Sequence, residues 1–421
     1  MSKFTLSFTV SNFADNQRYN KSNLKNNTNI MFKIYVTLIL LLSLSQIFGQ
    51  ENDCDCQKEL DNVSQLITNS ESYDDQIKKT GKETDFARWK ATLKKEIEKD
   101  SLSSFFCAGY LQKYISYIND RHNELYRIPE DLELSVPFYS KDIDTLTPGN
   151  DPVSGIYVAG SDRILVQKEN DSTYFGITLN SNSKDWKPGK IRLRLNRTQN
   201  NDYELFEFYK NGLLYYQKNL SVIDGRIKST FWNKDNQYFF NKNHEDNFNF
   251  DSSMAAFDYI GIKTLSRTKT LMKEADAFYK QHLDQLKKEN LIIDLRNNGG
   301  GATNQAKPLL KAISNNKNIQ RVYVMINFKT ASAAELTALA LKKDERTIIV
   351  GENSRGMLTY GYGNKAYSTQ TACMEYKLVL STEIADKDLI VYEYTGIQPD
   401  FYLDNKSDWI EQIVHLNTVA K

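Results

Sequence analysis

The segment Leu291–Gly301 constrains the fold of this chain more than any other stretch. It reads LIIDLRNNGGG, so a short aliphatic run ends in charged and amide side chains and three consecutive glycines. An apolar run without alternation is typical of a strand that is buried on both faces of a parallel sheet. Three glycines after it let the backbone approach another group closely. The segment therefore predicts a buried strand of an α/β sheet, followed by a loop that can form a site.

A second feature is a small hydroxyl residue at the start of an expected helix. Thr330–Glu335 reads TASAAE and runs on into Ala and Leu, which favour helices. A strand, a glycine loop and a serine at a helix N-terminus can form an acyl-transfer site, in which backbone N–H groups stabilise the oxyanion. The alternatives are that Ser332 only caps its helix and that the glycines only form a turn. A phosphate loop is excluded, because Ala302 and Thr303 stand where Lys and Ser/Thr would be needed.

Four short blocks, taken together, resemble those of a known family. They are IDLRNNGGG at 293–301, TASAAE at 330–335, GENSRG at 351–356 and GIQPD at 396–400. Their order and spacing are similar to those of the C-terminal-processing (tail-specific) and tricorn serine peptidases. The resemblance implies an α/β crotonase-like (ClpP/crotonase) catalytic domain and an endopeptidase that hydrolyses peptide bonds through an acyl-enzyme.

The resemblance also implies roles for individual residues. Ser332 would be the nucleophile, and the N–H groups of Gly300 and Ala333 would form the oxyanion hole. Glu335 lies one turn after Ser332 on the same face of the helix and would support the catalytic group. The alternative for Glu335 is that it complements the positive end of the helix dipole. No cofactor is implied, and no group of His, Cys and Asp residues has the spacing of a metal site.

The general base is the part of the site that the sequence does not assign. Serine needs a proton acceptor, usually Lys or His. The processing branch keeps a lysine where this chain has Met357, and the tricorn branch keeps a histidine where this chain has Gly261. Substitutes that cannot be ranked are His244, Lys263 and Lys365, while His122, His282 and His415 are expected on helices with polar neighbours and are weaker candidates.

The missing base keeps other functions open. The chain could be a catalytically inactive peptide-binding protein on the same fold. It could also be an exported protein that binds carbohydrate or envelope components through aromatic residues of its β-rich segment. A net charge of +1 without a basic stripe argues against nucleic acid as a partner. A peptide or protein substrate is therefore the expected partner.

Changes in hydrophobic pattern predict four segments along the chain. Residues 1–50 form an N-terminal extension with a signal peptide, and 51–145 form a helical domain with apolar residues at three-to-four spacing. Residues 146–245 hold short β-type runs and form an antiparallel β domain. Residues 246–421 alternate strands and helices and form the peptidase-like domain. The polar stretch Asn241–Ser253 is expected to be a linker, and no carboxylate-binding loop of the PDZ type is seen, so tail specificity is not expected.

The N-terminal extension has the pattern of a secretory signal. Met31-Phe32-Lys33 precedes the apolar stretch Ile34–Phe48, which is too short to span a bilayer. We expect translation to begin at Met31, the mature chain to begin near Glu51, and the protein to be periplasmic or secreted. No stable membrane insertion is expected after the signal is cleaved.

The four cysteines are expected to respond to this oxidising environment. Cys54 and Cys56 stand together near the start of the mature chain, and Cys107 and Cys373 follow. One bridge from the Cys54/Cys56 pair to Cys107 is predicted, and four free thiols are the alternative.

Overall fold

The computed structural model describes residues 54–128, 136–242, 244–363 and 365–419. The segment Cys54–Lys421 clusters as one compact unit, so the predicted boundaries at 145 and 245 remain predictions. No helix among the described residues is long and apolar enough to cross a membrane. The predicted signal peptide lies outside the described residues.

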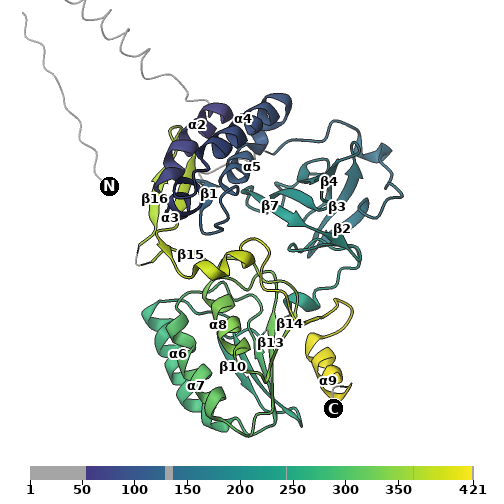
Figure 1. Cartoon of the computed structure of the whole chain (residues 1–421). Helices are drawn as coiled ribbons and strands as arrows, with labels where there is room; N and C mark the ends of the chain where they lie inside the picture. The colour runs from purple at the N-terminus through teal and green to yellow at the C-terminus, as the bar shows by residue number, and fades with distance from the viewer. Residues whose placement is uncertain (1–53, 129–135, 243, 364, 420–421) are drawn as a thin grey trace, which may run out of the picture. The chain divides into compact units, whose positions relative to one another are not determined.

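A mixed six-stranded sheet forms the centre of the C-terminal part (Figure 1). Its buried middle strand β12 is the strand predicted from Leu291, and all five of its residues are buried. Five of its strands (β11, β12, β13, β14 and β19) run parallel, and β10 pairs antiparallel with β11 at the edge. In order across the sheet, the strands are β10 Phe248–Asp251, β11 Phe257–Ile262, β12 Asn290–Asp294, β13 Arg321–Ile326, β14 Thr347–Gly351 and β19 Phe401–Tyr402.

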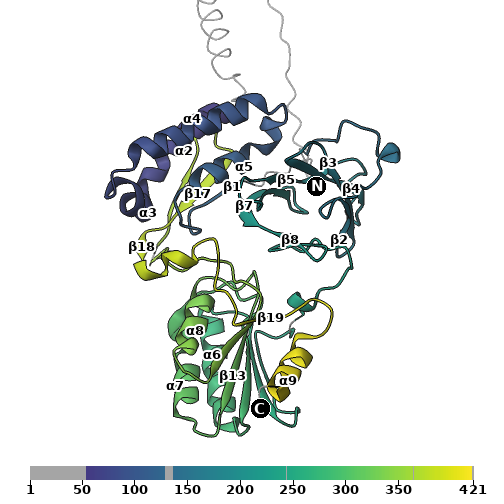
Figure 2. The ribbon, with the colours of Figure 1, turned by 45° about the vertical axis from the view of Figure 1, so that its right-hand side comes forward.

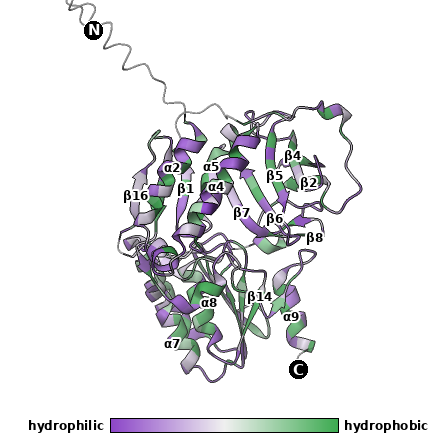
Figure 3. Cartoon of the chain, turned by 45° about the horizontal axis from the view of Figure 1, so that its top comes forward, coloured by the Kyte–Doolittle hydropathy of each residue, from purple (hydrophilic) through white to green (hydrophobic). Residues whose placement is uncertain are grey.

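Helices cover both faces of this sheet (Figure 2). On one face, the helices pack with Ile293 and Val324 in a shared core; on the other, Trp409 and Ile413 pack with Ile292 and Tyr323. In Figure 3 the hydrophobic colour follows the helix α8, as expected for a helix that packs against a buried sheet. The first face carries α6 Lys269–His282, α7 Lys307–Asn315 and α8 Ala333–Lys342, and the second carries α9 Trp409–Val419.

The predicted linker at 241–253 is wrong in one respect, because it contains β10. The alternating sequence FNFD at Phe248–Asp251 places Phe248 in the core while its neighbours are half-buried. This alternation is typical of an edge strand with one covered face. The polar residues around it concealed the pattern.

The N-terminal part contains three long helices, in the segment predicted to be a helical domain, and a small sheet. The helices are α2 Cys56–Leu66, α4 Glu83–Lys99 and α5 Ser103–Ile115. After α5 the chain turns and enters β1 Glu124–Arg127, which pairs antiparallel with β17 Tyr376–Leu380; β17 in turn pairs with β16 Tyr367–Gln370. A hairpin from near the C-terminus therefore completes the core of the N-terminal helices. The predicted helical domain 51–145 is therefore not helical throughout, because α5 ends at Ile115 and the strand β1 follows.

The middle of the chain forms one six-stranded antiparallel sheet. Each predicted β-type run overlaps one of its strands. A two-stranded hairpin of β8 Val222–Ile223 and β9 Arg226–Ile227 follows it. The six strands are β2 Gly155–Ala159, β3 Asp162–Lys168, β4 Thr173–Asn180, β5 Ile191–Arg197, β6 Tyr203–Phe208 and β7 Leu214–Leu220.

All four cysteines are paired. Cys56 is bridged to Cys107, which confirms the predicted bridge, and Cys54 is bridged to Cys373. The second bridge was not predicted, and the alternative of four free thiols is wrong. The reason is that β16 and β17 return to the N-terminal helices, a contact between distant segments that local sequence patterns do not indicate.

Candidate active site

Ser332 occupies a sharp turn between β13 and α8. Its backbone has φ 52° and ψ −120°, a conformation that non-glycine residues rarely adopt and that costs about 1–3 kcal/mol. The turn is held by neighbours: Ser332 N–H donates to Glu335 Oε2 at 2.7 Å, and Ala331 N–H donates to the Asn298 carbonyl at 2.9 Å. A strained serine at a sharp turn before a helix is the arrangement that presents the nucleophilic hydroxyl in α/β-hydrolases.

His122 contacts this serine. Its Nε2 lies 3.3 Å from Ser332 Oγ, although the two residues are 210 positions apart. His122 is buried, and burial lowers its pKa to about 4, with the positive charge of Arg355 acting in the same direction. The imidazole is therefore uncharged at neutral pH and can accept a proton. The expectation that His122 lies on a helix is wrong, because it lies in the turn between α5 and β1.

Asp120 stands behind His122. Its Oδ1 lies 3.8 Å from His122 Nδ1, which has no hydrogen-bond partner among the described residues. Asp120 Oδ1 also accepts a hydrogen bond from the backbone N–H of His122 at 2.9 Å, and Asp120 Oδ2 accepts one from Ser381 Oγ at 2.5 Å. Burial raises the pKa of Asp120 to about 6. Serine, histidine and aspartate thus follow one another, as in a proton-transfer triad.

The carboxylate of Glu335 joins the serine turn to the segment 354–357. Glu335 is fully buried and accepts four hydrogen bonds, all from groups around the site. Burial raises its pKa, while these donors act against that shift. Its contacts favour a role in holding the two segments together, and none of its hydrogen bonds goes to the Ser332 hydroxyl. Besides Ser332 N–H, the donors are Ser354 Oγ, Gly356 N–H and Met357 N–H, at 2.5, 2.7 and 2.9 Å.

The glycine loop lies directly against the serine turn. A side chain at Gly300 would place its first carbon 2.7 Å from the Ala331 carbonyl oxygen and 2.9 Å from Ala333 N, so only glycine fits. The structure therefore brings together Gly300 and Ala333, the two predicted oxyanion donors. Gly300 N–H, however, already donates to Asn298 Oδ1 at 2.9 Å. Ala333 N–H has no hydrogen-bond partner in the described part of the chain, so it is the available donor.

The other candidate bases lie in other surroundings. His244 covers Gly261, where a Cβ would lie 2.2 Å from its Nε2, and Lys263 Nζ donates to the Glu245 carbonyl. His282 stacks on Phe250. Among the described residues, no group of three or more His, Cys, Asp or Glu side chains could hold a metal ion. Lys365 follows the short strand β15 Tyr360–Gly361, and His415 lies in α9.

The sequence contains a pattern that indicates a loop, and not a helix, at His122. The apolar period of α5 stops where Asn119-Asp120-Arg121-His122-Asn123 begins, and such a polar run marks a loop. Loops carry catalytic residues more often than surface helices do. The run indicates the loop, but it does not indicate that the loop reaches Ser332.

Comparison with known proteins places this site in a family context. Residues 258–322 and 312–402 match the model of Peptidase family S41, which confirms the resemblance for that part of the chain. No curated protein matches the chain.

The comparison with solved structures gives matches of low identity. The photosystem II D1 C-terminal processing protease is 14% identical, covers 86% of this chain and 97% of its own, and has a TM-score of 0.33. The tricorn protease is 12% identical, with coverage of 79% and 34% and a TM-score of 0.35. A putative S41 protease from Bacteroides fragilis is 10% identical, with coverage of 73% and 90% and a TM-score of 0.34.

Proposed function

We propose, from the match of residues 258–402 to peptidase family S41, that this chain is an exported serine endopeptidase on a crotonase-like fold. The observation that carries the proposal is the 3.3 Å contact between Ser332 Oγ and His122 Nε2. It supplies the proton acceptor that a serine nucleophile needs. It supports an active enzyme over a catalytically inactive peptide-binding protein on the same fold.

In the acylation step, Ser332 Oγ attacks the carbonyl carbon of the peptide bond while His122 Nε2 takes the hydroxyl proton. The carbonyl oxygen becomes an oxyanion and accepts a hydrogen bond from Ala333 N–H. The C–N bond then breaks, and His122 returns the proton to the departing amine. The product is an ester between Ser332 and the N-terminal part of the substrate.

In the deacylation step, water takes the place of the amine. His122 Nε2 accepts a proton from this water while its oxygen attacks the ester carbon; the bond between that carbon and Ser332 Oγ then breaks, His122 returns the proton to Ser332 Oγ, and the N-terminal part of the substrate leaves as a carboxylic acid. His122 can do this only with its other proton on Nδ1, which faces Asp120 Oδ1 at 3.8 Å. The carboxylate of Asp120 orients that tautomer and stabilises the imidazolium that forms in both steps.

Two observations support export. The predicted signal peptide would direct the chain out of the cytoplasm. The described residues contain two disulfides, and disulfides persist mainly in oxidising compartments. N-terminal sequencing of the protein recovered from the producing cell tests this part, and a retained Met1 would contradict it.

A fluorophosphonate probe tests the enzymatic part. We expect it to label the wild type and Ser253→Ala, an exposed serine control, and to leave Ser332→Ala unlabelled. His122→Gln should slow both labelling and peptide hydrolysis by roughly 10²–10⁴-fold, the usual contribution of a general base. Equal labelling of Ser332→Ala and the wild type would remove Ser332 from the mechanism.

A further inference from the structure

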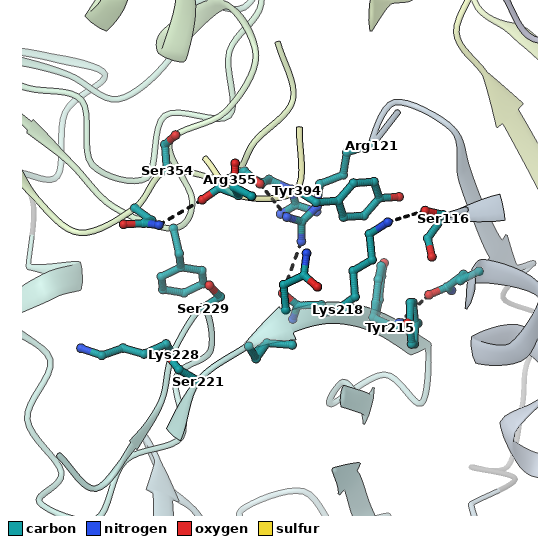
Figure 4. A pocket seen from close by; sticks show the side chains of 18 of the residues that line it. Ser116, Arg121, Tyr215, Lys218, Ser221, Lys228, Ser229, Ser354, Arg355 and Tyr394 are labelled. Carbon is teal, nitrogen blue, oxygen red and sulfur yellow. Dashed lines mark hydrogen bonds between the residues drawn. The ribbon is translucent and has the colours of Figure 1, made fainter. Parts of the chain in front are cut away.

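A cavity of 780 Å³ is lined by residues that neighbour the proposed catalytic pair in the chain; Figure 4 shows part of its wall. Its wall includes Arg121 and Asn123, the two neighbours of His122 in the chain. It also includes Ser354, which donates to Glu335, and Arg355, whose N–H donates to the Thr330 carbonyl. Neither Ser332 nor His122 lines the cavity, but the segments around Arg121 and Arg355 belong to both the cavity and the site.

The cations that line this cavity lack acidic partners. None of Arg121, Lys218, Lys228 and Arg355 forms an ion pair with any carboxylate of the described residues. The lining acid Glu352 is already bound by Arg226, at 2.7 and 3.2 Å. Glu124 is the other acid in the wall; burial raises its pKa while the charges of Arg355 and Arg121 act against that shift, so it offsets part of their positive charge. The cavity thus carries an excess of positive charge.

Two of these cations are fixed in place by neutral groups. Arg121 donates to the Arg355 carbonyl at 2.5 Å and to Gln217 Oε1 at 3.3 Å. Lys218 Nζ donates to the Ser116 carbonyl and lies 4.1 Å from the centre of the Tyr394 ring. Neutral oxygens and a ring face orient a cation without cancelling its charge. The two side chains are therefore held ready for an anion.

The side chains of the other two cations have unused hydrogen-bond donors. The Arg355 guanidinium and Lys228 Nζ make no hydrogen bond to the described residues, and Arg355 Nε is buried without a partner. Arg355 is also close enough to His122 to lower its pKa. Figure 4 shows Arg355 beside Arg121, with Lys228 set apart from both. A guanidinium with free N–H groups matches a carboxylate in a two-pronged contact.

We propose that this cavity binds acidic side chains of the peptide substrate, so that the enzyme prefers peptides with Asp or Glu near the cleaved bond. The proposal rests on the peptidase function. The four cations come from four separate segments of the chain, and a single carboxylate at a peptide terminus could reach only part of them. A segment with more than one acidic side chain therefore fits the charge distribution better than a free C-terminus does.

The test compares three mixed peptide libraries. The first contains Asp and Glu, the second replaces them with Asn and Gln, and both are amidated at the C-terminus. The third has the same amino-acid composition as the second, but its peptides end in a free carboxylate. We expect the wild type to cleave the first library at least roughly tenfold faster than the second, the effect of about one charge-assisted contact. Arg355→Gln should bring that ratio close to one, and raising the salt should reduce it.

Lys311→Gln is the matched control, because Lys311 is an exposed cation on α7 outside the cavity. It should leave the ratio unchanged. Equal cleavage of the first two libraries by the wild type would overturn the inference while leaving the peptidase function intact. Faster cleavage of the third library alone would overturn the assignment to side chains.

Binding to Ser332→Ala, measured by fluorescence anisotropy with labelled pools, separates the two proposals. If no library is cleaved, the peptidase function fails. Tighter binding of the acidic pool by at least tenfold would then still support the cavity as an acidic-peptide site. Equal binding of the first two pools would overturn it.

Discussion

At the scale of single residues, the backbone conformation of Ser332 leads to a prediction about the free energy of unfolding. The conformation φ 52°, ψ −120° is strained for serine and alanine but is open to glycine. Ser332→Gly and Ser332→Ala both remove the hydroxyl, so both should abolish hydrolysis. We expect the glycine variant to be the more stable of the two by roughly 1 kcal/mol, because relief of strain exceeds the added entropy of the unfolded chain. Urea denaturation measures the difference, and a less stable glycine variant would contradict the strained geometry.

A second prediction concerns the ionisation of His122. A general base must be unprotonated, and burial lowers the pKa of this imidazole to about 4. We expect kcat/KM to rise with pH near 4, where His122 loses its proton, and again near 6, where Asp120 ionises, and to be level by pH 7. The lowered pKa also means that the unfolded chain binds a proton at His122 more readily than the folded chain does. The contribution of His122 to the free energy of unfolding is therefore lost as the pH falls from about 6.5 towards 4. A profile that levels off only above pH 7 would mean that His122 is charged in the free enzyme.

These two residues show how far sequence reasoning could reach at this scale. Ser332 was predicted because its context is local: a glycine loop, a strand and a helix start lie within 50 positions of it. His122 was named only among the weaker candidate bases, because its contact with Ser332 spans 210 positions and depends on how two parts of the chain pack. A histidine in a polar loop carries no mark of its distant partner.

At the scale of elements, Glu335 links the start of α8 to the segment that carries Arg355. Glu335→Gln keeps the size of the side chain but replaces one acceptor oxygen with a donor that faces N–H groups. We expect a loss of about 1–3 kcal/mol, the cost of unsatisfied buried polar groups, together with reduced hydrolysis. Chemical denaturation tests this, with Glu345→Gln as an exposed control. Full stability with lost turnover would instead assign Glu335 to the chemistry.

The elements themselves were predicted best where a continuous apolar pattern was present. The parallel strands β11, β12, β13 and β14 had such a run, and the strands of the antiparallel sheet had apolar or alternating runs, such as IRLRL in β5. The short edge strand β10 and the turn after α5 were missed, because polar residues surround or interrupt their patterns. The pairing of β1 with β17 was also missed, since it joins positions that are about 250 residues apart and neither sequence indicates the other.

At the scale of the whole molecule, the Cys54–Cys373 bridge ties the N-terminal helices to the hairpin of β16 and β17. This hairpin leads to Ser381, which donates to Asp120 behind His122. The bridge closes 319 residues, against 51 for Cys56–Cys107. The loop-entropy model therefore gives it the larger contribution to stability, by roughly 1.5 kcal/mol.

We therefore expect Cys54→Ser/Cys373→Ser to lower the free energy of unfolding more than Cys56→Ser/Cys107→Ser does. The same variant should lose more activity, because a looser hairpin leaves Asp120 and His122 less well held. Urea denaturation and peptide hydrolysis under oxidising conditions measure the two effects, and full reduction should bring both variants and the wild type to similar stability. If the Cys54/Cys373 variant kept full activity while losing stability, the hairpin would contribute to folding and not to the position of the proposed base.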